Sequence, residues 1–303
     1  MTHFTGADVA DQSGKCMIVT GANTGLGFET AKALAAKNAR VLLACRNQDK
    51  ANAAMDKIRQ TTPDANLAFI PLDQADIASI RRAAELVMQE PRLDVLINNA
   101  GVMVPPLMRT AQGFELQFGV NHLGCFALTS LLLPKLAQNA GARVVVTASI
   151  AHKTGKLNWD DLNSHKNYGR TQRYSDSKLA NLMFMIELDR RLRASGLPVS
   201  AMGCHPGVAA TDLMRHLGPL QFAAPLMGLV LNSAEMGAWP ALQAATDPSA
   251  QSGDYFGSQG WREMRGASGA AHKSKMAQNA ELARRLWDIS VELTGIDPQL
   301  PPA

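Results

Sequence analysis

Short apolar runs alternate with longer segments of helical periodicity along much of the chain. The runs are rich in Val, Ile and Leu without strict polar alternation, which is typical of strands buried on both faces of a parallel sheet. They lie at residues 16–20, 40–44, 67–71, 94–98, 143–148 and 198–203. The segments of helical periodicity between them lie at about residues 25–37, 48–60, 76–90, 111–138 and 173–195.

This alternation predicts right-handed βαβ units, and therefore a Rossmann-type α/β fold with a doubly wound parallel sheet of about seven strands and helices on both faces. The pattern contains no linker, so we expect a single domain over residues 1–303, with residues 1–13 as an N-terminal tail. A helical pattern from Ser233, a strand-like segment at 254–256 and an amphipathic helix near 277–293 complete the expected elements.

Composition narrows the class of protein. The chain is 46% hydrophobic and 18% charged, a globular balance that argues against general disorder. The net charge is +4 without a run of five basic residues, so we expect no nucleic-acid partner. Four cysteines without a CxxC pair predict a reduced, cytoplasmic protein with no disulfide and no metal site. No apolar stretch is long enough to predict a transmembrane segment.

A glycine-rich turn follows the first apolar run and precedes a helical segment. Gly21 permits a tight turn, Gly25 lets the backbone approach a pyrophosphate, and Gly27 allows close contact between helix and strand. The N-terminus of the helix offers free N–H groups and a positive dipole end to phosphates. The turn therefore predicts a dinucleotide site made by Gly21, Asn23, Thr24, Gly25, Leu26 and Gly27.

Further motifs follow this TGxxxGxG turn in order: Asn98–Gly101, Asn121, Ser149, the YSDSK run from Tyr174 to Lys178, and His205-Pro206-Gly207. Through them the chain resembles the short-chain dehydrogenase/reductase family over roughly residues 14–295. Within the family it is most similar to the branch of retinol dehydrogenases and protochlorophyllide reductases. The resemblance implies an oxidoreductase that uses a nicotinamide cofactor.

The predicted catalytic group is Tyr174, Lys178, Ser149 and Asn121. Tyr174 and Lys178 are four residues apart, which places them on one face of a helix. A nearby ammonium, together with an oxidised nicotinamide, favours the phenolate and brings the pKa of tyrosine toward a range useful for acid–base catalysis. Ser149 can hydrogen-bond the substrate oxygen. The resemblance adds that Lys178 binds the nicotinamide ribose and that Asn121 supports a water between Lys178 and solvent.

The second strand ends at Arg46 with no acidic residue before Asp49, although an NAD site usually has a carboxylate there. Arg46 can pair with a 2′-phosphate, so the sequence favours NADP(H); a solvated surface arginine is the alternative. Asn23 and Thr24 supply no second basic residue, so the preference is expected to be moderate. The resemblance implies that Asp73 contacts the adenine amino group and that Pro206, Gly207 and Thr211 lie near the nicotinamide carboxamide. Asn99, Ala100 and Gly101 end the fourth strand beside the crevice where cofactors bind in such sheets; turn formation alone is the alternative, and the resemblance implies both.

Two long segments interrupt the periodic pattern, and such loops are usually functional. The polar residues 150–172 are expected to form an insertion loop. Residues 208–231 are apolar and, by the resemblance, form a substrate lid, which favours a hydrophobic carbonyl or alcohol; packing on the core is the alternative. In the loop, His152 and His165 are candidate bases, although a surface position is expected for each, and Tyr168 lacks a lysine partner.

Three functions remain open from the sequence. The leading one is an NADP(H)-dependent carbonyl reductase or alcohol dehydrogenase with Tyr174 as general acid/base. A reductase of C=C bonds, as in the protochlorophyllide reductase branch, is the second. A non-catalytic NADP(H)-binding sensor or scaffold is the third, disfavoured because the Ser, Tyr, Lys and Asn positions are all filled. The oligomeric state is open, with a homodimer slightly favoured.

Overall fold

The structure is a computed structural model that describes residues 3–208 and 232–302. Within these ranges one sheet has eight strands in the order β3-β2-β1-β4-β5-β6-β7-β8. The strands are β1 (Cys16–Thr20), β2 (Arg40–Cys45), β3 (Leu67–Pro71), β4 (Val95–Asn98), β5 (Ala142–Thr147), β6 (Val199–Cys204), β7 (Tyr255–Ser258) and β8 (Ser268–Ala270). Thr211 and all of the predicted lid except Val208 lie outside the described residues.

The strand order confirms the predicted doubly wound fold. Neighbouring strands pair in parallel from β3 to β7, and β8 pairs with β7 in the antiparallel sense. The sheet therefore has one strand more than the seven or so expected. The additional strand is only Ser268–Ala270, whose Ser-Gly-Ala sequence carries no apolar pattern that would have predicted it.

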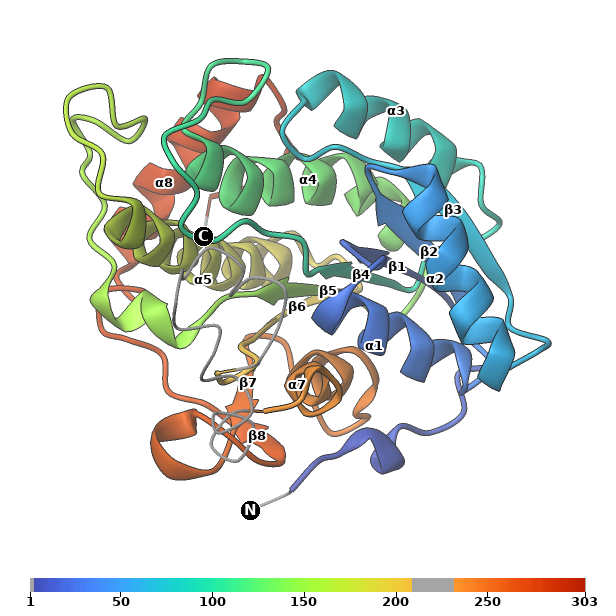
Figure 1. Ribbon diagram of the computed structural model, residues 1–303. Helices are drawn as coiled ribbons and strands as arrows, with labels where there is room; N and C mark the ends of the chain where they lie inside the picture. The colour runs from blue at the N-terminus through green and yellow to red at the C-terminus, as the bar shows by residue number, and fades with distance from the viewer. Residues whose placement is uncertain (1–2, 209–231, 303) are drawn as a thin grey trace.

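Helices cover both faces of the sheet (Figure 1). They are α1 (Gly25–Ala35), α2 (Gln48–Thr61), α3 (Ile77–Met88), α4 (Gly124–Leu136), α5 (Arg170–Ser195), α7 (Ala234–Thr246) and α8 (Ala280–Thr294). One hydrophobic cluster joins the sheet to α3, α4, α5 and α8, and a second joins it to α1, α2 and α7. The two clusters form the core on either side of the sheet.

Alternate residues of a strand enter opposite clusters. In β1, Ile18 packs into the first cluster while Met17 and Val19 pack into the second. Because successive side chains of a strand point to opposite faces, a strand buried on both sides is continuously apolar. This burial explains why the apolar runs predicted the strands so well.

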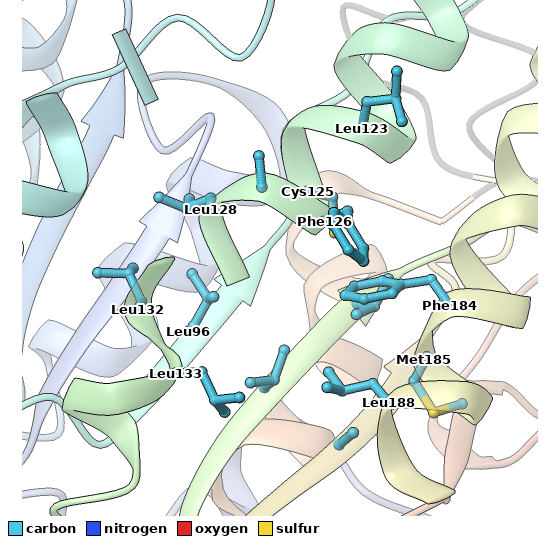
Figure 2. Close-up of a cluster of buried hydrophobic side chains, with 14 of the residues drawn as sticks. Leu96, Leu123, Cys125, Phe126, Leu128, Leu132, Leu133, Phe184, Met185 and Leu188 are labelled. Atoms are coloured by element: carbon cyan, nitrogen blue, oxygen red, sulfur yellow. The ribbon is translucent and has the colours of Figure 1, made fainter. Parts of the chain in front are cut away.

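Aromatic side chains join the helices of the first cluster (Figure 2). The ring of Phe126 in α4 meets Phe184 of α5 edge-on at a centroid distance of 5.5 Å, and Trp287 of α8 at 5.2 Å. Edge-to-face pairs are favoured because the positive ring edge meets the negative face of its partner. Helix α8 thereby fixes the outer side of α5.

Some element boundaries differ from those predicted. The helix expected over 111–138 begins with a π-helical turn, Phe118–Leu123, which runs directly into α4. The carboxylate of Glu115 accepts hydrogen bonds from the amides of Gln117 and Phe118. These contacts cap the start of the helical segment that contains the π-helical turn. Residues 150–172 contain no strand, as expected; they open with a 3-10 turn, Ile150–Thr154, and end in the first turn of α5.

Replacing Phe184 tests the aromatic contact between α4, α5 and α8. Phe184→Ala removes a nearly buried ring and leaves a cavity, so the free energy of unfolding should fall by about 3–5 kcal/mol. Urea denaturation measures the change. Met88→Ala, at a side chain 40% exposed on α3, is the matched control and should change stability little. An equal loss in both variants would contradict the proposed packing.

Candidate active site

The predicted site residues converge on a cavity of about 360 Å³ at the carboxyl ends of the central strands. Those that line it are Gly21, Asn23, Thr24, Gly25, Leu26, Gly27, Arg46, Asp73, Asn99, Ala100, Gly101, Tyr174, Lys178 and Pro206. The Ser149 side chain lowers the pKa of the neighbouring Tyr174, Asn121 lies beside Gly101, and Gly207 follows Pro206. Apart from Thr211, which is not described, the structure brings every predicted site residue to one place.

The glycine turn has the backbone shape that its residues allow. Gly21 and Gly25 have φ angles of 69° and 56°, in the left-handed region that favours glycine. A Cβ at Gly27 would clash with the Gly21 carbonyl oxygen and lie 2.5 Å from Asn99 Nδ2. The first amides of α1, which have no partner within the helix, thus come to the cavity wall. This cradle fits the phosphates of a dinucleotide.

Thr20, the last residue of β1, joins the glycine turn to the end of β4. Its Oγ1 accepts hydrogen bonds from the amides of Asn99 (3.0 Å) and Ala100 (2.9 Å). The side-chain amide of Asn99 donates to the Thr20 carbonyl at 2.8 Å. Thr20 therefore holds together two segments that line the cavity. No local sequence pattern indicates this role of Thr20, because its partners lie about eighty residues further along the chain.

Two basic residues just after β2 reach the cavity, although the sequence predicted only Arg46. Arg46 and Lys50 both line the cavity. Asn47 caps α2 by accepting the Lys50 amide at 2.8 Å, so Lys50 lies in the first turn of that helix. The sequence predicted no second basic residue here, since Asn23 and Thr24 of the glycine turn are uncharged. The sequence signal for Lys50 is its spacing of four residues from Arg46 across a helix start.

Lys178 is buried in the floor of the site. Its ammonium donates to the Thr147 carbonyl at 3.1 Å and lies 5.9 Å from the ring centroid of Tyr174. Burial lowers the pKa of Lys178 to about 8. At pH 7 the group is therefore still mostly charged. Asn181 donates to the same carbonyl at 3.1 Å and completes the floor.

The environment of Tyr174 differs from the sequence-based expectation. Burial raises the pKa of its phenol, and the hydrogen bond with Ser149 lowers it only in part. The residues around Tyr174 therefore do not lower its pKa as the sequence predicted. Desolvation, which disfavours the charged phenolate, outweighs the effect of Ser149. The residues described here keep Tyr174 in its protonated form, the form that can donate a proton.

Asn121 stands in the π-helical turn and clamps the loop after β4. Its Oδ1 accepts the Val102 amide at 2.7 Å, and its Nδ2 donates to the Val102 carbonyl at 2.9 Å and to Ser177 Oγ at 2.9 Å. Both ends of the side chain are therefore engaged by the protein itself. Asn121 thereby positions the loop after β4. This loop passes close to Lys178, because a Cβ added at Gly101 would lie only 3.5 Å from the Lys178 Nζ.

The turn after β6 also requires glycine. Gly207 has a φ of 69°, and a Cβ there would clash with the Met264 carbonyl oxygen. Asn232 donates to the Pro206 carbonyl at 2.8 Å and ties this turn to the start of the segment before α7. Pro206 is thereby held at the cavity wall.

Among the loop residues, the surface assignment of His152 is wrong. His152 is only 1% exposed, because the 3-10 turn packs its ring edge-on against Tyr255 at 5.7 Å. His165 is exposed, as expected. The Tyr168 hydroxyl donates to the Pro105 carbonyl at 2.8 Å, which agrees with a structural place in the loop.

Comparison with known proteins identifies the class. The family model for short chain dehydrogenases matches residues 15–220, so the chain belongs to the short-chain dehydrogenase family and is an oxidoreductase of a nicotinamide-using class. It is 42% identical to human retinol dehydrogenase 13 over 296 residues, covering 94% of this chain and 86% of that protein. Human retinol dehydrogenase 12 is also 42% identical, over 288 residues, with 93% and 87% covered. The expected retinol dehydrogenase-like branch is confirmed.

A solved structure shares almost the whole architecture. A putative uncharacterized protein from Mycobacterium Paratuberculosis superposes with a TM-score of 0.83 at 37% identity, covering 99% of this chain and 100% of that one.

Among the described residues, no helix is long and apolar enough to cross a membrane.

Gly27→Ala tests the phosphate cradle. The added methyl must displace the Gly21 carbonyl or Asn99, so the affinity for NADPH should fall by at least about tenfold, or about 1.4 kcal/mol. Fluorescence titration measures binding, and thermal melting checks that the variant folds. Gly169→Ala, where a Cβ would meet only Gln172 at an ordinary 3.7 Å, is the control and should bind NADPH normally. Unchanged binding in a folded Gly27→Ala variant would exclude this turn as the cofactor site.

Proposed function

We propose that the protein transfers hydride between NADP(H) and a hydrophobic carbonyl or alcohol, with Tyr174 as general acid/base. The observation that carries this proposal is that the phenol of Tyr174 lies at the same cavity as Lys178 and the glycine turn. Ser149 is close enough to Tyr174 to lower the pKa of the phenol. When bound, the nicotinamide supplies or accepts the hydride. The chain's own residues bind and orient the reactants and move the proton.

Tyr174 and Ser149 present two hydroxyl groups to the substrate oxygen. In reduction, the Tyr174 phenol donates its proton to that oxygen while Ser149 holds it by a hydrogen bond. In oxidation, the phenolate of Tyr174 accepts the proton. The Lys178 ammonium uses one N–H on Thr147 and keeps others for the nicotinamide ribose, while its charge favours the phenolate.

Arg46 and Lys50 support NADP(H) over NAD. A 2′-phosphate carries negative charge, and the two cations that line the cavity attract it, with Arg46 able to donate as a fork. The remaining cofactor assignments follow the family pattern. By that pattern, Asp73 contacts the adenine amino group, Asn99, Ala100 and Gly101 lie beside the cofactor crevice, and Pro206 and Gly207 lie near the nicotinamide carboxamide, to which the family pattern also assigns Thr211.

The substrate class rests on the relatives and on composition. The relatives' names describe retinol dehydrogenases, so an apolar primary alcohol or its aldehyde is the first substrate to test. The Leu- and Met-rich segment 208–231, proposed as a lid, agrees with an apolar substrate. A single domain, a cytoplasmic location and a homodimer stay predictions. Reduction of an enone at its C=C bond remains the second candidate reaction.

Tyr174→Phe tests the proton-transfer role. Loss of the phenol should lower kcat by at least about 100-fold because general acid catalysis is removed, while NADPH binding stays within about twofold. The assay follows NADPH oxidation with hydrophobic aldehydes, ketones and enones, including retinal, and the enone products are analysed. Tyr168→Phe is the matched control and should retain activity.

Each alternative has its own outcome in this assay. Turnover that survives Tyr174→Phe would mean that another group donates the proton. A saturated ketone from the enone would favour the C=C reductase. Tight NADPH binding without turnover on any substrate would favour the sensor.

Arg46→Ala and Lys50→Ala test the cofactor preference. Each should weaken NADPH binding by about tenfold through loss of one charged contact, and leave NADH binding within about twofold. Parallel titrations with both cofactors give the ratio. Lys57→Ala removes a cation of α2 that does not line the cavity and should change neither affinity. Equal weakening of NADPH and NADH would contradict recognition of the 2′-phosphate.

A further inference from the structure

His152 lies directly behind the proposed catalytic serine. Ser149 caps the 3-10 turn Ile150–Thr154, and its main-chain carbonyl accepts two hydrogen bonds from His152. One comes from the His152 amide at 3.0 Å and the other from the ring Nδ1 at 2.6 Å. The imidazole thus closes the same turn that carries the Ser149 hydroxyl.

The partners of the ring determine which nitrogen carries the proton. A carbonyl oxygen only accepts, so Nδ1 must carry the hydrogen. The other nitrogen, Nε2, faces the amide of Ser274 at 3.3 Å, and an amide only donates. Both contacts are satisfied only by the neutral tautomer with hydrogen on Nδ1.

The surroundings of His152 favour that neutral form. The side chain is 1% exposed, and Tyr255 covers it with an edge-on ring and a hydroxyl 3.5 Å from Nδ1. Burial lowers the pKa of His152 to about 4, although the hydrogen bond to the Ser149 carbonyl raises it in part. The ring therefore remains an uncharged link between Ser149 and Ser274 at neutral pH.

Ser149 needs such a link because β5 ends two residues before it, at Thr147. Beyond the strand, Ala148 still pairs with Cys204, but no sheet bond reaches Ser149 among the described contacts. The Ser149 Oγ accepts the Ala151 amide at 3.2 Å, and the Ser149 side chain lowers the pKa of the Tyr174 phenol. A shift of this turn would move the hydroxyl away from Tyr174 and from the substrate oxygen.

We propose that His152 is a positioning residue for this reaction: its Nδ1–H holds the Ser149 carbonyl and so aims the Ser149 hydroxyl at Tyr174 and the substrate oxygen. The inference rests on the proposed function. The position of the Ser149 hydroxyl then depends on a segment about 120 residues away, because the Ser274 amide holds the Nε2 side of the His152 ring.

Two substitutions separate the two contacts of the ring. In His152→Asn, the side-chain amide nitrogen occupies the place of Nδ1 and keeps the donor to Ser149. In His152→Gln, the longer side chain reaches the place of Nε2 and keeps only an acceptor for Ser274. His152→Leu removes both contacts. All three variants are compared by thermal melting, NADPH affinity, kcat, KM and pH profile.

The expected pattern follows the Ser149 contact. His152→Asn should keep kcat within about threefold, and His152→Gln and His152→Leu should lose about 10–100-fold, since a misplacement near 1 Å costs up to about 100-fold. NADPH affinity should stay within about twofold in all three. The hydrogen bond with Ser149 lowers the pKa of Tyr174, so its loss should move the basic limb of the pH profile upward in the Gln and Leu variants only.

Other patterns would overturn the proposal. It fails if His152→Gln matches the wild type, if His152→Asn loses as much kcat as His152→Leu, or if the loss of kcat simply follows the loss of thermal stability. A purely structural role for His152 would not move the pH profile.

Nitrogen NMR tests the contact without turnover. The ring nitrogens of His152 are assigned by their absence from the spectrum of His152→Asn. At pH 7 we expect a neutral ring with hydrogen on Nδ1; hydrogen on Nε2 or a charged ring would overturn the proposal. The NMR spectrum needs no substrate, so it tests the His152 contact independently of turnover. If the wild-type protein reduces no substrate of the assay, the proposed function fails, and the NMR result still shows whether the His152 contact exists.

Discussion

The site depends on the parallel pairing of β1 with β2 on one side and with β4 on the other. Thr20 is level with Ala44 in β2, and Val19 is level with Ile97 in β4. The chain builds the sheet outward from β1 in one direction and then returns to build it in the other. The connections after β1 and β4 therefore diverge and leave a crevice at the carboxyl ends of the strands. The glycine turn and the Asn99 segment meet there.

Buried polar side chains then attach the site to the strands. Lys178 and Asn181 share the Thr147 carbonyl, Asn121 clamps Val102, and Asn99 is held by the last residue of β1. Most of these partners are backbone atoms, which cannot rotate away as side chains do. A buried polar group that lost its partner would cost about 1–3 kcal/mol, so each contact resists displacement.

The C-terminal part of the chain supports the same site from outside. Trp287 of α8 packs on Phe126 and lies beside Phe184, on the helix that carries Tyr174. Just before α8, Ser274 supports the ring of His152 and, through it, the turn of Ser149. Two of the proposed reacting groups are thus braced by residues that follow the last parallel strand.

The sequence by itself determined the strands, most helices, the glycine turn and the Tyr174–Lys178 pair, because each depends on neighbours two to four residues apart. Tertiary structure decided the eighth strand and the burial of His152. It also decided that the pKa of Tyr174 is raised, since desolvation depends on everything packed around the phenol. These properties come from segments distant in sequence, whose meeting no local pattern records.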